Sequence, residues 1–390
     1  RLEGKRLRTS RYSWPERHDR LKMAPLAGPI TIEPFSWKKI RLGDLHPHTQ
    51  SPSVKYGEKS TSGNSNMKVY RTTADGIQKI KYIESDWYYL EYDPCTGRIT
   101  SLVDKKQNWQ IIDESSQFTF FQFVREFPDP LVKGDRKALY DRDMEKEKYD
   151  ISCWNSEWKA VRQTALQPRG NRIEENARGI ELILEFDVPG AKFLEQRILI
   201  SGDSPVIELN IKVMKEDVRS PEAVYFTFPL QLSKGWRCHF DTAGLPVELD
   251  EQQLPGSCRD WMAVNSFVAL HDNDHAVVLY CPEAPLVQVG DFNFGRQNSA
   301  IPRNENPLLL AWPLNNYWDT NFRATQPGLI ELRYYFSAIR KFDVFDVCQQ
   351  ASALSTPLEI HPLISCAENE EKQFIEKKKK KIRVLYVKQA

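Results

Sequence analysis

Residues 178–188 read RGIELILEFDV, and residues 205–215 read PVIELNIKVMK. In both stretches apolar and polar side chains alternate one by one. Alternation with a period of two places the apolar side chains on one face of a β-strand and the polar ones on the other. Each stretch is therefore predicted to be a strand with one buried and one wetter face.

The same alternation recurs in AVYFTFPLQL at 223–232 and in LIELRYYF at 329–336. Turn signals such as Pro189-Gly190 and Pro327-Gly328 separate the predicted strands. We find no convincing amphipathic helix longer than about three turns, and the charged segment 129–150 is the candidate for a short one. The pattern predicts an all-β chain in which two large antiparallel sheets pack face to face.

Charge and hydropathy exclude two classes of partner. The chain has 390 residues, of which 54 are basic and 53 acidic, so the net charge is +1. Such a balance produces no global field that would attract nucleic acid or anionic lipid. No apolar run approaches the ~18 residues that are needed to span a bilayer. We expect neither a nucleic acid nor a membrane as partner.

The cysteines indicate a reducing environment. Seven of them are scattered along the chain without a C-x-x-C pair, which argues against a disulfide framework and against a structural zinc site. We expect buried thiols and a cytoplasmic location. The sequence starts at Arg1 and its first methionine is Met23, so we also expect the translation product to continue upstream.

Most short catalytic motifs are absent. The sequence contains no G-x-S-x-G, no G-x-x-x-x-G-K-[ST] and no G-x-G-x-x-G, so acyl transfer and nucleotide binding have no support. His46 and His48 lie close together, but no further ligand completes a metal site. The segment HDNDH at 271–275 lies between two apolar runs and is predicted to be a hairpin turn.

Three other stretches combine a Pro or Gly bend with polar groups where a predicted strand ends. They are QLPGSCRDW at 253–261, APLVQVGD at 284–291 and LNNYWDTN at 314–321. The last contains amides, a carboxylate and two large aromatic rings, which are the groups that bind sugar hydroxyls and cover sugar rings. The alternative is a long loop whose aromatic side chains pack on the core.

In this order and spacing, the three stretches resemble the C-terminal β-domain of glycoside hydrolase family 38, the α-mannosidases. IESDWYYLEYDPCTGRITSLVDKKQNWQIID at 83–113 resembles a strand–turn–strand unit of the same family, with Ser85 where the family has Asn. EPFSWKKIRL at 33–42 resembles the short β element that precedes this unit. The resemblance extends approximately over residues 25–350.

The resemblance implies a large antiparallel supersandwich of the galactose-mutarotase-like type, preceded by a small N-terminal β element. We expect an N-terminal β element and linker at 1–66, with the small polar segment 50–66 as the linker. The supersandwich is expected at 67–352. A Lys-rich tail follows at 353–390 and departs from the family pattern, so a truncation or a change of reading frame is plausible there.

The resemblance also implies an activity that this chain does not contain by itself. The family hydrolyses terminal α-mannosides with retention, using an upstream barrel that carries a zinc ion and an Asp nucleophile. No motif of that barrel occurs in this sequence, so we assign no catalytic residue and no metal ligand to it. Zinc is expected in the missing barrel of the same polypeptide, and the expected partners of this chain are that barrel and carbohydrate.

Six residues are expected to face the barrel or to lie near the substrate. These are Asn315, Asn316, Tyr317 and Trp318 on the loop, and Arg259 and Asp260 supporting it. The alternative is that the two aromatic residues only pack an interface between barrel and sandwich. Two other functions stay open: a stand-alone carbohydrate-binding sandwich, and a mutarotase-like sugar epimerase, which would need a His acid and a carboxylate base in one sheet concavity.

Overall fold

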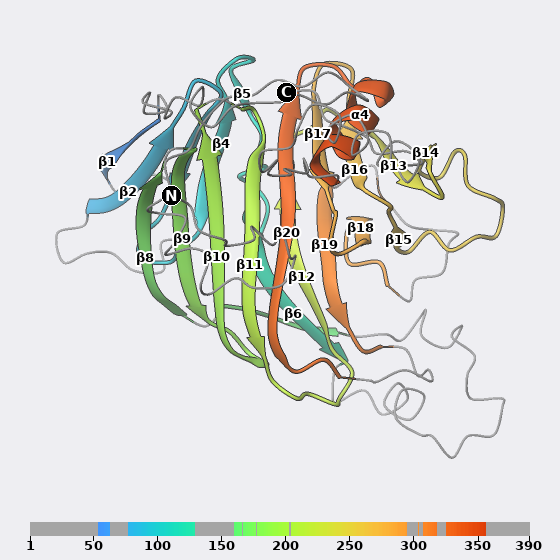
Figure 1. Ribbon diagram of the computed structural model, residues 1–390, viewed down its shortest axis with the longest axis horizontal. Coiled ribbons are helices and arrows are strands. Elements are labelled where there is room, and N and C mark those ends of the chain that lie inside the picture. Colours follow the sequence, from blue (N-terminus) through green and yellow to red (C-terminus); the bar gives the residue numbers. More distant parts are fainter. Residues whose placement is uncertain are drawn as a thin grey trace, which may run out of the picture.

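The computed structural model describes residues 54–62, 77–128, 160–165, 167–176, 178–202, 204–294, 303, 307–317 and 325–355. Its strands form three sheets, and every strand pair recorded among these residues is antiparallel (Figure 1). The predicted all-β class is confirmed, with a large antiparallel sandwich and a small N-terminal sheet.

The small sheet has five strands in the order β1-β2-β3-β4-β5. Its strands are β1 Lys55–Ser62, β2 Ile77–Glu84, β3 Tyr88–Tyr92, β4 Ile99–Asp104 and β5 Trp109–Gln110. Residues 55–62 were expected within a linker, but they form β1 and pair with β2 along eight positions, from Lys55↔Glu84 to Ser62↔Ile77. Their polar composition is typical of an edge strand, one side of which is not paired with another strand.

A nine-stranded sheet forms one layer of the sandwich, in the order β14-β13-β16-β17-β20-β11-β10-β9-β8. Its strands are β8 Gln167–Asn176, β9 Gly179–Asp187, β10 Ala191–Ser201, β11 Ile207–Lys215, β13 Arg237–Thr242, β14 Leu245–Glu248, β16 Phe267–His271, β17 Ala276–Tyr280 and β20 Gly328–Ile339.

A six-stranded sheet forms the other layer, in the order β15-β18-β19-β12-β6-β7. Its strands are β6 Gln122–Pro128, β7 Ala160–Thr164, β12 Ala223–Pro229, β15 Met262–Ala263, β18 Leu286–Gly290 and β19 Leu308–Asn315.

The main core lies between the two large sheets and follows the predicted alternation. On β9, Ile180, Leu182 and Leu184 enter this core, and on β12 Phe226 and Phe228 do the same. Burying one such side chain contributes about 1.5–3 kcal/mol. The periodicity of the sequence therefore selected the correct inward face of these strands.

The small sheet is fastened to the nine-stranded sheet by one buried tyrosine. The hydroxyl of Tyr88 donates to the carbonyl oxygen of Pro205 at 2.7 Å and accepts from the backbone N–H of Ala338 at 3.0 Å. Tyr88 is on β3, whereas its partners lie before β11 and on β20. One hydroxyl thus joins segments that are far apart in the chain.

The turn between β3 and β4 has the chemistry that its DPCTG sequence predicts. Asp93 accepts hydrogen bonds from the backbone N–H of Cys95 and from the hydroxyl of Thr96, both at 2.8 Å. Gly97 has a φ of +69°, and a Cβ placed there would lie 2.7 Å from the ring of Phe186. Only glycine combines this conformation with this close approach.

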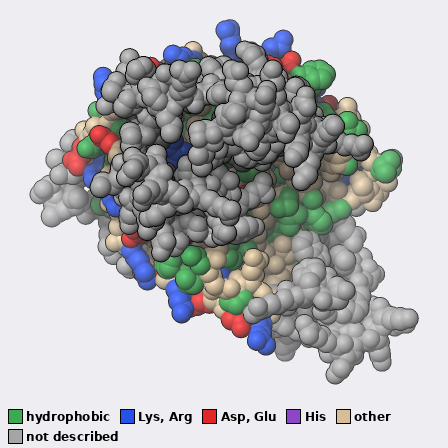
Figure 2. Space-filling model, viewed as in Figure 1, with side chains coloured by type: hydrophobic (Ala, Val, Ile, Leu, Met, Phe, Trp, Pro, Cys, Tyr) green, Lys and Arg blue, Asp and Glu red, His purple; other side chains and the backbone are tan. Residues whose placement is uncertain are grey.

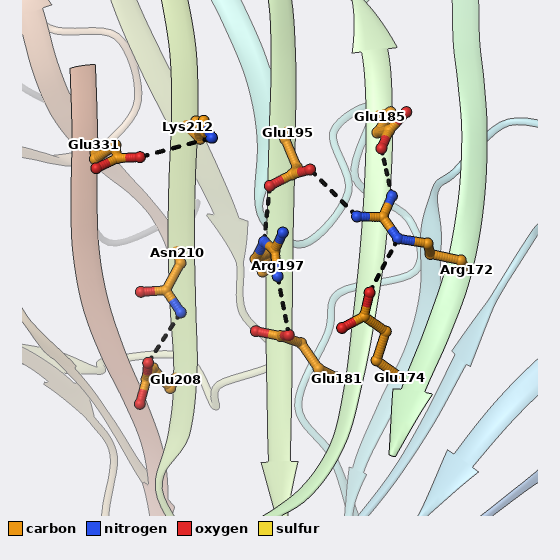
Figure 3. A network of polar contacts seen from close by, with 10 residues as sticks. All are labelled: Arg172, Glu174, Glu181, Glu185, Glu195, Arg197, Glu208, Asn210, Lys212 and Glu331. Carbon is orange, nitrogen blue, oxygen red and sulfur yellow. Dashed lines mark hydrogen bonds and ion pairs between the residues drawn. The ribbon is translucent and has the colours of Figure 1, made fainter. Parts of the chain in front are cut away.

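The outer face of the nine-stranded sheet carries ion pairs on β8 to β11 and β20 (Figure 3). Glu185 and Glu195 are directly opposite each other on neighbouring strands, where like charges repel. Arg172 contacts both carboxylates, at 3.5 Å for Glu195, and Arg197 bonds Glu195 at 2.7 Å and Glu181 at 3.2 Å. The guanidinium groups offset this repulsion.

Helix α4, Val344–Ser355, was not predicted. It lies on the outer face of the nine-stranded sheet at β16 and β17, where Val347 and Ala351 join a separate apolar cluster with Phe267 and Val278. The two helix residues are four positions apart and therefore lie on one face. Its apolar stripe is short and is bounded by exposed residues such as Phe345, so the helical periodicity of this segment is weak.

Charged side chains of both signs are interspersed around the rim of the face that Figure 2 shows. Among the described cysteines, Cys238 and Cys281 are buried, as expected, Cys348 is partly buried, and Cys95 and Cys258 are exposed. The expectation of buried thiols is wrong for Cys95 and Cys258, because both lie in connections outside the strands.

Candidate functional site

The three stretches singled out in the sequence converge on the outer face of the six-stranded sheet. Trp261, Leu286 and Tyr317 from these stretches join one cluster of aromatic and apolar side chains there, which we call the aromatic cluster. Its buried members are Val124, Ala223, Tyr225, Phe292, Phe294, Leu308, Leu310, Trp312 and Tyr317, and Phe118, Trp261 and Leu286 pack against it at partial exposure. The second face of this sheet is therefore buried too.

Trp312 on β19 joins the stretches within the aromatic cluster. Its ring is stacked on Tyr225 at 5.5 Å and lies 6.3 Å from Trp261 and 6.2 Å from Tyr317. Tyr317 is in turn stacked on Phe294 at 4.9 Å. Ring pairs at these separations contribute about 0.5–1.5 kcal/mol beyond their buried area, so the cluster rigidly connects 253–261 with 314–317.

A buried carboxylate, Glu126 on β6, lies at the end of the aromatic cluster. Its Oε1 accepts hydrogen bonds from the hydroxyls of Tyr317 at 3.0 Å and Tyr225 at 3.4 Å, and its Oε2 accepts from Nε of Arg162 at 2.7 Å. Glu126 is only 1% exposed. The guanidinium of Arg162 also lies 4.1 Å from the ring of Phe292, which combines an ion pair with a cation–π contact.

Burial dominates the electrostatics of this group. It raises the pKa of the Glu126 carboxyl, while Arg162 and the two tyrosine hydroxyls act in the opposite direction. Burial and the nearby negative charge of Glu126 both raise the pKa of Tyr225 and of Tyr317. Both tyrosines therefore stay protonated and act as hydrogen-bond donors at neutral pH.

Gln288, from the stretch 284–291, shapes the loop after β18. Its side-chain amide donates to the hydroxyl of Tyr225 at 3.0 Å, and its Oε1 accepts from the backbone N–H groups of Asn293 at 2.6 Å and Phe294 at 3.1 Å. A single buried side chain thus fixes the backbone that carries two rings of the aromatic cluster.

Arg303 connects the stretches 253–261 and 284–291. Its guanidinium donates to Asp250 Oδ2 at 2.8 Å, to the carbonyl oxygen of Val289 at 3.1 Å, and to the carbonyl oxygen of Arg259. Arg259 itself lies 3.7 Å from Asp250, and Asp260 is buried. The two residues expected to support the loop are therefore part of a packed segment.

Asn316 uses its side chain within the sandwich. Its Oδ1 accepts from the backbone N–H of Glu222 at 2.6 Å, and its Nδ2 donates to the carbonyl oxygens of Ser220 at 3.0 Å and Val218 at 3.3 Å. It fixes the segment before β12. Asn315 ends β19 opposite Ala223. Trp318 lies outside the described residues, as do His46 and His48.

A second buried carboxylate, Glu222, was not predicted. It bonds Nε of Arg125 at 2.6 Å and pairs with Lys215, whose ammonium also donates to the carbonyl oxygen of Gly190 at 3.0 Å. Lys215 is on the nine-stranded sheet and Arg125 on the six-stranded one. No pattern in the sequence brings these residues together, because the contact depends on how the two sheets close.

The predicted turn at 271–275 is confirmed, since it joins β16 and β17 in register from His271↔Ala276. Asp272 accepts from the backbone N–H groups of Asp274 at 2.9 Å and His275 at 2.8 Å.

No group of three or more His, Cys, Asp or Glu side chains in the described ranges could hold a metal ion. Within the same ranges, no helix combines the length and apolarity needed to cross a membrane.

Within the described residues, the side chains of the candidate site bond and pack against other strands and loops of the sandwich. The hydroxyl of Tyr317 and the amide of Asn316 are engaged by protein groups, and the face of Tyr317 is covered by Phe294. This arrangement agrees with the alternative in which the aromatic side chain of Tyr317 packs on the core. Contact of the 315–318 segment with a sugar or with a barrel stays a prediction.

Comparison with known proteins gives structural similarity only. No protein family and no curated protein matches the sequence. A glycosyl hydrolase family 38 protein from Enterococcus faecalis is similar at 12% identity with a TM-score of 0.47, over 71% of this chain and 32% of that one. An α-mannosidase from Enterococcus faecalis V583 gives 10% identity and a TM-score of 0.46, over 79% and 38% of the two chains.

A galactose mutarotase-like protein from Lactobacillus casei ATCC 334 is similar at 10% identity with a TM-score of 0.37, over 67% of this chain and 100% of that one. The matched part spans about a third of the two larger Enterococcus proteins, 32% and 38% of their lengths. With every one of these TM-scores below 0.5, the fold of this chain rests on its own sheets.

Proposed function

We propose that this chain is the β-sandwich portion of a retaining, zinc-dependent α-mannosidase of the family 38 type, and that it braces a catalytic barrel. The observation that carries the proposal is the convergence of the three stretches behind the sequence resemblance. They meet on one sheet face, where Trp312 contacts Trp261 and Tyr317, and Arg303 bonds the backbone of both 253–261 and 284–291.

A bracing face must present a rigid surface, and the aromatic cluster supplies rigidity in two ways. Its rings pack at 5–6 Å from one another, as Trp312 does on Tyr225 at 5.5 Å. Its buried carboxylate, Glu126, accepts hydrogen bonds from Arg162 and Tyr317 within the sandwich. Such a buried group of hydrogen bonds resists deformation, because moving one member breaks the bonds of the others.

In this proposal the chemistry belongs to residues upstream of Arg1. A zinc ion and an Asp nucleophile held there would form and resolve the glycosyl-enzyme. The sandwich would contribute part of the cleft wall through the segment that begins at Asn315. A reducing, cytoplasmic location is part of the same proposal and agrees with the free thiols among the described residues.

The decisive experiment begins with the DNA upstream of the codon for Arg1. We expect an open frame in phase that encodes a His- and Asp-rich barrel. The longer protein should then cleave an aryl α-mannoside with zinc, and the chain of residues 1–390 should not. Zinc-dependent turnover by this chain alone would refute the bracing role.

Assays on the isolated chain of residues 1–390 distinguish the two alternative functions. Saturable binding of mannose or oligomannose by the isolated chain, lost in Trp318→Ala, would support a stand-alone carbohydrate-binding sandwich. Accelerated interconversion of the anomers of a free sugar would support the epimerase. Neither result is expected if the segment after Asn315 works only in contact with a barrel.

A further inference from the structure

Two histidines form a hydrogen-bonded pair where helix α4 meets the nine-stranded sheet. Nδ1 of His239 on β13 lies 2.9 Å from Nε2 of His271 on the neighbouring strand β16. Phe342 covers both imidazoles: its ring is 4.2 Å from that of His271 with an interplanar angle of 7°, and 4.8 Å from that of His239. With the ring of Phe342 over it, His271 is only 2% exposed.

The residue that covers the histidines also leads into the helix. Phe342 lies between the end of β20 and the start of α4, and Asp343 next to it caps the helix by accepting from the backbone N–H groups of Phe345 at 2.8 Å and Asp346 at 3.1 Å. Phe342 packs against the same apolar cluster as Val347 of the helix. Phe342 therefore contacts both the histidine pair and the apolar cluster on which α4 packs.

The pair can hold only a limited number of protons. A bond between two imidazoles needs one N–H donor and one free lone pair. A first extra proton fits on Nε2 of His239, which faces Glu248 Oε2 at 3.8 Å. A second would convert both facing nitrogens into donors, so the bond would be lost and two positive charges would lie side by side.

The surroundings do not compensate a second charge. Burial lowers the pKa of His239, and it lowers that of His271 to about 4, with the neighbouring imidazole and Arg237 acting in the same direction. Glu248 and Asp272 act against this shift. From the connection that carries Phe342, the nearby charged residues Arg340, Lys341 and Asp343 are exposed to solvent.

We propose that His239, His271 and Phe342 form an acid-sensitive latch for helix α4. Uptake of a proton by the second imidazole breaks the pair, displaces Phe342 and releases α4 from the sheet. The apolar face of Phe267 and Val278 beneath the helix then becomes accessible. This inference does not depend on the proposed function.

Hydrogen exchange of the α4 amides, corrected for the intrinsic effect of pH, tests the latch in the intact chain. Between the ordinary histidine pKa of about 6.5 and the lowered value of about 4, the open form binds more protons than the closed form. Protection of 344–355 should therefore fall on acidification by up to about tenfold per pH unit for one coupled proton. Amides of β9 and β10 should keep their protection.

Three variants make the test specific. His271→Gln keeps a hydrogen-bonding side chain that does not titrate, so the loss of α4 protection on acidification should be smaller than in the parent protein. His275→Gln changes the histidine at the other end of the same turn and should respond like the parent protein. Phe342→Leu should lower the protection of α4 at every pH without abolishing it, so that the response to pH persists, and it serves if His271→Gln does not fold.

A pH response of α4 in His271→Gln equal to that of the parent protein would overturn the latch. So would protection of α4 in the parent protein, or in Phe342→Leu, that does not change between pH 7 and the onset of global unfolding.

Discussion

Tyr317 belongs to a segment chosen for its resemblance to sugar-binding loops, yet its hydroxyl is turned inward to a carboxylate that is 1% exposed. That bond has a cost if broken, because Glu126 would lose one of the donors that compensate its burial. Tyr317 and Asn316, two of the candidates taken from the sequence, bond other groups of the sandwich.

Replacing Tyr317 with Phe removes one donor and leaves the ring. We expect the free energy of unfolding to fall by about 1–3 kcal/mol, as for the loss of a partner to a buried charged group. Urea unfolding measures it. Tyr56→Phe, on an edge strand where the tyrosine is 53% exposed, is the matched control and should change little. Equal effects of the two substitutions would show that the bond to Glu126 is unimportant.

Glu126 should also affect how stability depends on pH. Its pKa is raised in the folded protein, so the folded state holds this proton more tightly than the unfolded state does. The stability that it contributes is complete below the unfolded pKa and is lost as pH rises through the folded pKa. Glu126→Gln removes this titration and keeps an acceptor for Tyr317.

We therefore expect the stability of Glu126→Gln, relative to the parent protein, to improve between pH 4.5 and pH 7.5. Urea unfolding at both values provides the comparison. A relative loss on going to pH 7.5 would mean that the ion pair with Arg162 outweighs burial and that the pKa is depressed.

Among the strands, the alternation of apolar and polar residues predicted the buried face correctly where the other face is exposed to water. It did not predict burial of the second face where both faces are covered. At the end of β9 it separated Phe186 in the core from Glu185 and Asp187, whose side chains are 39% and 45% exposed. On β12 it selected Phe226 but gave no reason to bury Tyr225, whose face is covered by rings from β19 and from the loop after β18. Contacts between segments that are distant in the chain produce no periodic pattern of apolar residues in either segment.

The convergence of the three stretches could likewise not be predicted from the sequence, although their residue types were distinctive. Arg303 joins two of them by donating to the backbone carbonyl oxygens of Val289 and Arg259, which carry no side-chain signature. Helix α4 was missed for a related reason, since only Val347 and Ala351 are buried along its length.

The ion pairs across β8 to β11 should differ in their contributions according to burial. Arg197→Met would leave Glu181, which is 4% exposed at its side chain, without its guanidinium partner. We expect a loss of about 3 kcal/mol, because an unpaired buried charge is costly. Arg169→Met breaks a pair with Asp187 whose side chains are about half exposed, and should cost less than about 1 kcal/mol.

Chemical denaturation at low and at high salt checks both substitutions. The effect of Arg169→Met should fade as salt rises, whereas that of Arg197→Met should persist. Similar losses for both, or a loss for Arg197→Met that high salt abolishes, would show that the outer face behaves as ordinary solvated surface.

For the assembled sandwich, thiol reactivity reports which cysteines the sheets enclose. Cys95 and Cys258 should react with a soluble disulfide reagent in the native state. Cys238 and Cys281 should react only after unfolding, because burial hides them and raises the pKa of both thiols. Peptide mapping by mass spectrometry identifies the modified positions, and native labelling of Cys281 would contradict the sheet packing.

The position of β20 in the nine-stranded sheet has a consequence for biosynthesis. This strand lies between β17 and β11, although it follows all the other strands of its sheet in the chain. A ribosome must therefore finish residues 328–339 before two half-sheets with open edges can be sealed into one. Until then the nascent chain exposes unpaired backbone to its neighbours. A protein that ends just before Gly328 should accumulate in the insoluble fraction or depend on a chaperone.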